Sequence, residues 1–376
     1  MSSLMPEVAP LHVLAHPAFR TRGRNPYNSL LYSHLVEAGV LVDEFSRARL
    51  LAGGHSLWHL HWPEENLNSR SFRRAAAYSA GLLALLDWAK WRGIKIVWTI
   101  HNLQAHEGFY PRLERWFWQR FAARVDGYIS LSRSGQELAC DRFPALQNVP
   151  GFVIPHGHYR DLYPVPVSQQ VARATLGIAS TARVATFVGQ IRPYKNLSAL
   201  ITEFQGLVGS DLILLIAGSP LNAELSADLS TAARKDARIR LDLRFLSEAE
   251  IQLYVRAADL VVLPYQEVLN SGSAVLALSL DRPILVPKLG AFTELQEMVG
   301  EAWVSSYEGQ LSASDLELAF DWAVNADRAP TAPLQPMDWE LVAAATLDAY
   351  VSILTGIRTT SQATGASAGS PRRPHQ

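Results

Sequence analysis

Short apolar runs alternate with amphipathic stretches along most of the chain. A run that is apolar on both faces indicates a strand buried in a parallel sheet, whereas apolar positions three or four residues apart indicate a helix. In the first half this pattern predicts strands at 11–15, 40–42, 57–61, 94–100, 127–131 and 152–155, and helices at 29–38, 71–91 and 112–124. In the second half it predicts strands at 184–188, 212–217, 260–264, 284–286 and 302–305, and helices at 197–207, 221–235, 248–257 and 274–280. Because the alternation occurs twice, we predict an α/β protein with two doubly wound, Rossmann-like domains.

The domain boundary is expected where this periodicity stops. Residues 156–168 are rich in Pro, Tyr and His and have no helical or strand period. We therefore assign 1–165 to the first domain, 166–338 to the second and 339–356 to a C-terminal helix. Residues 357–376 are small and polar, with too little apolar surface to fold, so we expect a disordered tail.

Composition removes several classes of function. The formal net charge of −1 lacks the basic excess of a general nucleic-acid binder, so we expect no nucleic-acid partner. A lone cysteine, Cys140, cannot form an internal disulfide. The chain shows neither a basic start followed by an apolar run nor a continuous apolar stretch of membrane-spanning length. We expect a cytoplasmic protein, at most peripherally attached to the inner face of a membrane.

The segment 184–196, VATFVGQIRPYKN, is the first candidate binding motif. A predicted strand ends at Val188, Gly189 permits a tight turn, and Arg192 and Lys195 follow just before a predicted helix. Ligands of doubly wound sheets bind at the carboxyl ends of the strands, where these two cations would hold a diphosphate. The alternative is a solvated basic loop.

A second motif lies at 260–280, LVVLPYQEVLNSGSAVLALSL. Ser271, Gly272 and Ser273 open an apolar helix, and free backbone N–H groups at such a helix N-terminus bind anions. Either serine could instead be an ordinary N-cap. With cations in one motif and N–H donors in the other, the two together predict a two-sided diphosphate clamp.

These motifs, with DRPILVPKLGAFTEL at 281–295, resemble the donor-binding half of family 4-like GT-B glycosyltransferases. In the first half, NPYNSLLYSHLVEAGV, LWHLHWPE and IVWTIHNLQAHE are similar to the bacterial exopolysaccharide branch, which includes β-mannosyltransferases that use GDP-mannose. The resemblance implies two facing domains, with the C-terminal helix crossing back. It also implies a hexosyltransferase acting on a nucleoside diphosphate sugar and a glycan, with a lipid-linked acceptor favoured. It adds Tyr265 and Glu294 to the donor site and implies no cofactor and no catalytic metal.

The sequence departs from the family pattern at one place. Retaining members of family 4 carry two glutamates around the small-residue turn, and the corresponding positions here are Leu269 and Leu276. We therefore favour an inverting mechanism. Retaining transfer and a non-catalytic partner that still binds nucleotide sugars remain alternatives, and a sugar-nucleotide 2-epimerase is disfavoured because no acidic cluster surrounds the sugar site.

Inverting transfer needs a general base, which in this fold comes from the N-terminal domain. The candidates are His101, which follows the strand at 94–100, Glu64 after the strand at 57–61, and Glu107 on the next loop. His61, His101 and His106 fit no zinc-binding spacing that would support a metal site.

Two more segments are candidates for contacts with the acceptor or a membrane. Arg24, Asn25 and Tyr27 follow the first strand and could contact the acceptor, although an exposed turn explains them equally well. The segment 109–124, FYPRLERWFWQRFAAR, mixes aromatic residues with arginines. It could dock on an anionic membrane, but a core helix with a solvated face is the favoured interpretation.

Overall fold

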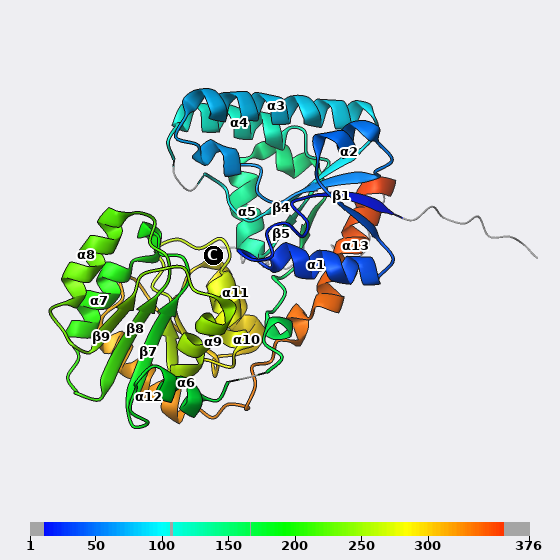
Figure 1. Ribbon diagram of the computed structural model, residues 1–376. Helices are drawn as coiled ribbons and strands as arrows, with labels where there is room; N and C mark the ends of the chain where they lie inside the picture. Colours follow the sequence, from blue (N-terminus) through cyan, green and yellow to red (C-terminus); the bar gives the residue numbers. More distant parts are fainter. Residues whose placement is uncertain (1–10, 106–107, 166, 357–376) are drawn as a thin grey trace, which may run out of the picture. The chain divides into compact units, whose positions relative to one another are not determined.

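The computed structural model describes residues 11–105, 108–165 and 167–356 (Figure 1). The described residues divide into two units. The first contains residues up to 131, 136–154 and those from 339 onward; the second contains 132–135 and 155–338. The second unit thus begins earlier than the boundary expected from the sequence. Within it, the His158 backbone N–H donates to the Met337 carbonyl, and the Tyr159 N–H donates to the Ser279 hydroxyl.

The first unit is built on a six-stranded parallel sheet in the order β2-β1-β3-β4-β5-β6. Its strands are β1 (His12–His16), β2 (Leu41–Glu44), β3 (Leu57–Leu60), β4 (Lys95–Ile100), β5 (Gly127–Ser130) and β6 (Gly151–Val153). Its helices are α1 (Tyr27–Glu37), α2 (Arg47–Ala52), α3 (Phe72–Trp91), α4 (Pro111–Ala122), α5 (Arg133–Arg142, whose first residues cluster with the second unit) and α13 (Trp339–Thr355). Short 3₁₀ turns lie at Glu65–Asn68 and Pro144–Asn148.

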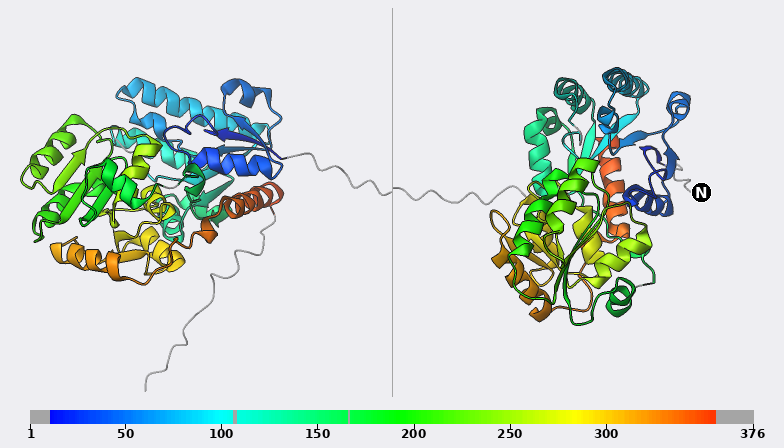
Figure 2. Two further views of the ribbon diagram at one scale, coloured as in Figure 1. Left: turned by 60° about the horizontal axis from the view of Figure 1, so that its bottom comes forward. Right: turned by 60° about the vertical axis from the view of Figure 1, so that its left-hand side comes forward.

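Helices cover both faces of this sheet, as expected for strands that are apolar on both sides. The helices α1 and α13 pack side by side on one face, and α3 and α4 lie on the other (Figures 1 and 2). Gly127 in β5 permits the close approach of α13, because a Cβ there would lie 2.5 Å from the Ile353 side chain. The C-terminal helix is therefore an integral part of the first unit.

The second unit repeats the architecture with the sheet order β12-β11-β10-β7-β8-β9, all parallel. Its strands are β7 (Arg183–Val188), β8 (Leu212–Ala217), β9 (Ile239–Asp242), β10 (Leu260–Val262), β11 (Ile284–Pro287) and β12 (Val304–Tyr307). Its helices are α6 (Gln169–Thr175), α7 (Leu197–Gln205), α8 (Ala223–Ala233), α9 (Glu248–Ala257), α10 (Gly272–Ser279), α11 (Gly290–Val299) and α12 (Ala313–Asn325). Three 3₁₀ turns lie at Arg160–Leu162, Pro193–Lys195 and Gln335–Met337.

The prediction of two doubly wound α/β domains is confirmed. The strand β9 was missed by the sequence pattern. It pairs with β8 alone at the edge of its sheet, and only Ile239 in it is buried, so it lacks the continuous apolar run that identified the central strands. Among the described residues, no helix has the length and apolar character needed to cross a membrane.

Candidate active site

In the second sheet the strand order reverses between β7 and β10. Doubly wound sheets bind their ligands at such a reversal, outside the carboxyl ends of the strands, where the loops on either side diverge. The segment that follows β7 carries Gly189, Arg192 and Lys195, and the segment that follows β10 carries Tyr265 and leads to α10. The two motifs singled out in the sequence thus lie at the point where the topology favours a ligand.

The two motifs meet at Gly189. This residue has a φ of 135°, and a Cβ there would lie 3.0 Å from the Ser273 Oγ and 3.9 Å from the Lys195 Nζ. The backbone after β7, the first turn of α10 and the Lys195 ammonium therefore lie next to one another around Gly189. Arg192 is directed differently: its guanidinium donates to the Ile191 carbonyl and to the Gln190 side chain within its own loop.

Lys195 is an unusual cation because it is almost completely buried, with 7% of its surface exposed. Its Nζ lies 5.5 Å from the centre of the Phe187 ring and 5.1 Å from that of Tyr265. Burial lowers the pKa of Lys195, and Arg192 acts in the same direction, whereas Tyr194 opposes the shift. A desolvated ammonium of this kind gains more from an anionic ligand than an exposed one does.

The turn before α10 presents backbone donors. Ser271 is the N-cap of α10, and its side chain accepts the Ala274 N–H. A Cβ on Gly272 would lie 3.1 Å from the Tyr159 hydroxyl and 3.8 Å from the His156 Nε2. Burial lowers the pKa of His156 to about 4, so the ring is neutral at physiological pH. Ser271 thus has the N-cap role that the sequence left as an alternative, and the anion-binding role of this turn stays a prediction.

Tyr265 contributes a buried hydroxyl that makes no hydrogen bond to the residues the structure describes. Burial raises the pKa of Tyr265 to about 12; the nearby hydroxyls of Ser273 and Ser271 oppose this shift without meeting hydrogen-bond geometry. The ring also lines a pocket of about 170 Å³ at the carboxyl ends of β10, β11 and β12, together with Asn196, Lys288 and Tyr307.

Glu294, predicted to contact the donor, is already engaged. Its two carboxylate oxygens accept the backbone N–H groups of Arg133 and Ser134, each at 2.7 Å. All three residues cluster with the second unit. Within that unit the Glu294 carboxylate binds two consecutive backbone N–H groups, which is a common role for a carboxylate.

In the first sheet the strand order reverses between β1 and β3, and the candidate base Glu64 follows β3. Glu64 is 2% exposed, and its Oε1 accepts a hydrogen bond of 2.8 Å from the Asn102 side chain. Burial raises the pKa of Glu64 to about 8, against the opposing effect of that hydrogen bond. A carboxyl group with a pKa near the working pH is suited to proton transfer.

His101 lies at the carboxyl end of β4 and belongs to a chain of buried polar groups. Its Nε2 is 3.0 Å from the Nδ1 of His61, and the His61 Nε2 is 2.7 Å from the Tyr32 hydroxyl. The Tyr32 hydroxyl is also 2.9 Å from the His59 Nδ1. His59 in turn contacts Tyr350 at 2.6 Å and Thr99 at 2.7 Å. Burial lowers the pKa of His59 to about 3 and that of His61 well below its ordinary value, so both rings are neutral.

The neutral rings of His59 and His61 each have one N–H and one acceptor nitrogen. His61 therefore either donates from Nδ1 to the His101 Nε2 or accepts from it, and the Tyr32 hydroxyl links this choice to His59.

Aromatic rings hold His101 in place. The Trp62 ring stacks on it at 4.5 Å, and the Tyr27 ring meets it edge-on at 5.0 Å. Tyr27, which we predicted at the acceptor site, is 2% exposed and packs beside His101. Arg24 is exposed, and the Asn25 side chain accepts the Tyr27 N–H.

Glu107 and His106 lie outside the described residues. On α4, the rings of Phe117, Trp118 and Phe121 are buried, which agrees with the favoured interpretation of a core helix. Sequence reasoning missed Asn102 as the partner of Glu64, and His156 and Tyr159 beside Gly272. His156 and Tyr159 belong to the segment 153–159, VIPHGHY, which could have drawn attention to them in the sequence. Only the fold shows that this segment lies beside α10.

Comparison with known proteins agrees with this geometry. Residues 74–160 match the model of Glycosyltransferase Family 4, and residues 182–313 match that of Glycosyl transferases group 1. Sucrose-phosphate synthase from Thermosynechococcus elongatus shares the fold with a TM-score of 0.68 at 16% identity, over 92% of this chain and 100% of the other. HepE of Anabaena, solved with UDP and glucose, gives a TM-score of 0.58 at 14% identity, over 92% and 98% of the two chains.

Two doubly wound units with these matches define a GT-B glycosyltransferase, a hexosyltransferase that uses a nucleotide sugar. The chain is also 34% identical, over 84% of its length and 84% of the relative, to the GDP-mannose:glycolipid 4-beta-D-mannosyltransferase of Xanthomonas campestris pv. campestris. At this identity and coverage it belongs to the same glycosyltransferase family as that enzyme.

Proposed function

We propose that this protein transfers mannose from GDP-mannose to a glycolipid and inverts the configuration at the anomeric carbon. The donor and the acceptor are inferred from one observation. The chain is 34% identical, over most of both chains, to a mannosyltransferase whose name specifies GDP-mannose and a glycolipid. A β-mannoside made from α-linked GDP-mannose requires inversion. The absence of glutamate at Leu269 and Leu276, where retaining relatives carry it, supports the same stereochemistry.

In this proposal the diphosphate of GDP-mannose binds at the carboxyl ends of β7 and β10. Lys195 supplies a buried positive charge, and the backbone at Gly189 leaves room for a phosphate oxygen. The first turn of α10 adds N–H donors, and Arg192 exchanges its contacts within the loop for the phosphates. Fixed donors of this kind stabilise the charge that develops on the leaving group. We propose that they replace a catalytic divalent metal.

We assign proton removal to Glu64. The acceptor hydroxyl oxygen bonds to the anomeric carbon as the bond from that carbon to the β-phosphate oxygen breaks. The electron pair leaves with GDP, and the hydroxyl proton passes to the Glu64 carboxylate. His101 contacts the sugar hydroxyls, with its Nε2 bonded to His61, and Tyr27 and Trp62 hold its ring. Arg24 and Asn25 contribute to the acceptor site.

The donor is tested by calorimetric titration of the full chain with GDP, UDP, ADP and TDP in EDTA. GDP should bind at least about tenfold more tightly than the others, because a difference of roughly 1.4 kcal/mol in recognition of the base suffices. Lys195→Met keeps an alkyl chain beside the two rings. It should weaken GDP binding about 10- to 100-fold, because a hydrogen bond from a charged group is lost. Lys235→Met, an exposed lysine on the same unit, is the matched control. Equal affinities for all four nucleotides, or GDP affinity unchanged in Lys195→Met, would refute the assignment.

Product analysis separates the remaining alternatives. With GDP-mannose and a panel of synthetic lipid-linked oligosaccharides, inverting transfer gives a β-mannoside at the same rate in Mg²⁺ and in EDTA. An α-mannoside identifies a retaining enzyme. If the protein binds GDP tightly but forms no GDP from GDP-mannose with any acceptor, it is a non-catalytic nucleotide-sugar-binding partner.

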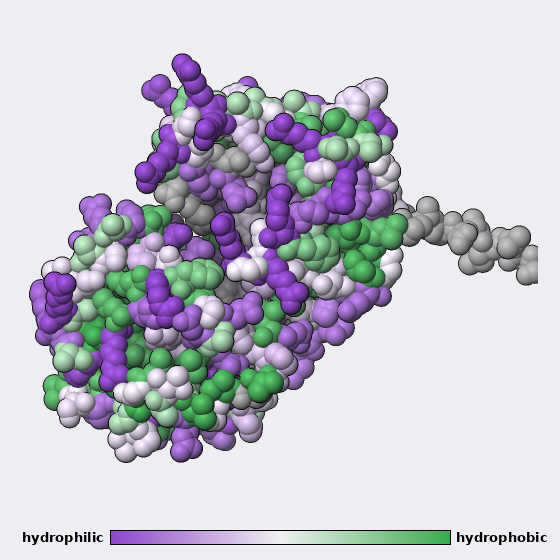
Figure 3. All heavy atoms as spheres, viewed as in Figure 1, coloured by the Kyte–Doolittle hydropathy of each residue, from purple (hydrophilic) through white to green (hydrophobic). Residues whose placement is uncertain are grey.

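A lipid-linked acceptor implies that the protein works at the inner face of a membrane. The buried rings of α4 leave Arg112 and Arg115 exposed at its start, and Figure 3 shows hydrophilic side chains projecting from the surface over α3 and α4. We propose that membrane attachment rests on these charges rather than on inserted aromatic rings.

A further inference from the structure

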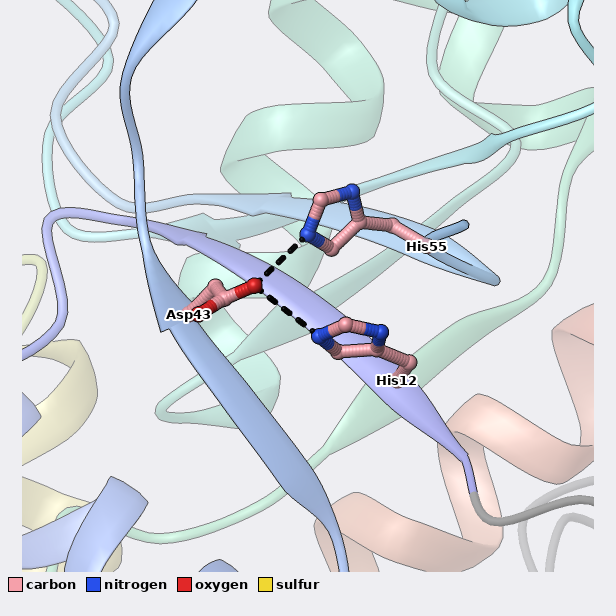
Figure 4. Close-up of side chains that lie close together, drawn as sticks. All are labelled: His12, Asp43 and His55. Carbon is pink, nitrogen blue, oxygen red and sulfur yellow. Dashed lines mark hydrogen bonds and ion pairs between the residues drawn. The ribbon is translucent and has the colours of Figure 1, made fainter. Parts of the chain in front are cut away.

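Three potential metal ligands converge in the first unit, at a place that the transfer reaction does not use. His12 is the first residue of β1, Asp43 lies in β2, and His55 precedes β3 (Figure 4). His61 and Glu64 follow the carboxyl end of β3, whereas His55 lies before its amino end. The cluster is therefore separate from the candidate active site.

The geometry of the three side chains is nearly that of a metal site. The Nε2 atoms of His12 and His55 each lie 3.0 Å from the same oxygen, Asp43 Oδ2, and all three ligand atoms lie within 4.8 Å of one another. A tetrahedral ion with bonds of about 2.0–2.1 Å requires ligand atoms roughly 3.3 Å apart. The two imidazole–carboxylate distances are a few tenths of an ångström shorter than this, and the two Nε2 atoms lie within 4.8 Å of each other, so a rearrangement of the side chains would place all three ligands around one ion.

The backbone holds the ligands in place without the ion. The parallel ladder pairs His12 with Leu41 and Leu14 with Asp43. The Ser56 N–H donates to the His12 carbonyl, which fixes the residue next to His55. The His55 side chain is only 3% exposed, and its Nδ1 has no partner among the described residues, so Nε2 alone orients the ring toward Asp43.

Charge and access also suit a cation. The side chains of His12 and Asp43 are 28% and 32% exposed, so an ion can enter from solvent and keep water as a fourth ligand. The His12 and His55 Nε2 atoms both face Asp43 Oδ2, so the one carboxylate of the set lies between the two imidazoles. Arg49 is 3.8 Å from the other Asp43 oxygen and 51% exposed, which allows it to turn into solvent.

We propose that His12, Asp43 and His55 form a structural zinc site. Two imidazoles and one carboxylate form a donor set that Zn²⁺ accepts readily, whereas Mg²⁺ and Ca²⁺ prefer oxygen ligands alone. Each histidine binds through Nε2 in the tautomer that carries its proton on Nδ1. The ion joins the edge strand β2 to β1 and to the segment before β3, and so stabilises the free edge of the sheet.

The test uses the full chain, stripped of metal and then titrated with ZnCl₂. Asp43→Asn retains a hydrogen-bond acceptor for both histidines but removes the anionic ligand. His12→Gln removes one imidazole ligand, at a partly exposed position. Glu37→Gln is the matched control, because Glu37 is an exposed carboxylate 3.4 Å from His34. The wild-type protein and Glu37→Gln should bind one more Zn²⁺ per chain than Asp43→Asn and His12→Gln. ZnCl₂, but not MgCl₂, should raise their melting temperature by mass action.

Co²⁺ provides a readout that does not depend on stability or activity. A tetrahedral Co²⁺ site produces intense visible absorption bands, and these should appear in the wild-type protein and in Glu37→Gln but not in Asp43→Asn. Equal zinc stoichiometry and affinity in the wild type and Asp43→Asn, or identical Co²⁺ spectra, would overturn the proposal even if His12→Gln failed to fold.

Discussion

Burial shifts the pKa of two candidate functional residues, one in each unit, in opposite directions. It raises the pKa of Glu64 to about 8 and lowers that of Lys195, because in each case it disfavours the charged form. The Glu64 carboxyl group has Asn102 as a hydrogen-bond partner, whereas the Lys195 ammonium faces aromatic rings. One residue is thereby suited to accept a proton and the other to bind an anion.

The raised pKa of Glu64 makes the stability of the protein depend on pH. In the folded state the pKa is about 8 against an ordinary value of 4.5, so the folded protein holds this proton more tightly than the unfolded chain does. The stabilisation is complete below pH 4.5 and is lost as the pH rises through 8. Glu64→Gln should remove up to about 1.4 kcal/mol per pH unit from the slope of unfolding free energy against pH in this window.

Urea titrations at several pH values would measure that slope, with Glu65→Gln as the control because Glu65 is its exposed neighbour. The same variant also tests catalysis, since the transfer rate of the wild type should increase with pH up to about 8 and that of Glu64→Gln should be low throughout. Equal slopes in Glu64→Gln and the wild type would show that Glu64 ionises normally.

At the residue scale, Glu64, His101, Gly189 and Lys195 became candidates in the sequence because each follows a predicted strand. The sequence could not indicate their environments. The burial of Lys195 against two rings depends on Tyr265, which follows a different strand, β10. The contact of His101 with His61 pairs residues forty positions apart in the chain. Such contacts are fixed by strand order, which a single sequence does not display.

At the scale of elements, the proposed donor site depends on how closely the ends of β7 and β8 approach. A Cβ on Gly218, which follows β8, would lie 1.8 Å from the Gly189 carbonyl oxygen, and Gly218 has a φ of 145°. Glycine at this position therefore allows the loop after β7 to adopt its conformation. The predicted strand ends located both loops, but the contact itself was not foreseeable from either motif.

Two alanine variants should separate folding from binding at this contact. Gly218→Ala should destabilise the protein by about 1–3 kcal/mol, because backbone atoms must move and the φ is unfavourable. Gly189→Ala has less severe overlap, with the Ser273 Oγ at 3.0 Å, but its methyl group occupies the space beside Lys195. It should therefore weaken GDP at least about tenfold, with a smaller loss in melting temperature than Gly218→Ala. Thermal unfolding and GDP titration would measure both, and normal GDP affinity in Gly189→Ala would place the phosphates elsewhere.

For the whole molecule, the sequence predicted the class and the two units because hydrophobic periodicity identifies buried strands. It placed the boundary too late because residues 155–165 have no period, although their hydrogen bonds assign them to the second unit. It also missed the edge strand β9, whose residues are mostly solvated. Segments at a sheet edge or a domain boundary have few buried apolar residues. Their structure depends on tertiary contacts, which the hydrophobic pattern of the sequence does not reveal.

The proposed membrane attachment involves the whole surface, and the charge distribution makes a specific prediction about it. If α4 binds anionic lipid through Arg112 and Arg115, the attraction falls with salt, because exposed charges are screened within about 10 Å at 0.1 M. Each basic residue near an anionic surface contributes about 1 kcal/mol. Arg112→Glu/Arg115→Glu should thus reduce cosedimentation with phosphatidylglycerol vesicles at least about tenfold, whereas Arg234→Glu/Lys235→Glu, the same charge change on the second unit, should not.

Neutral phosphatidylcholine vesicles should bind neither the wild type nor the variants. Equal loss in both double variants would mean that attraction depends on net charge alone, and binding that persists in Arg112→Glu/Arg115→Glu would place the membrane-facing surface away from α4.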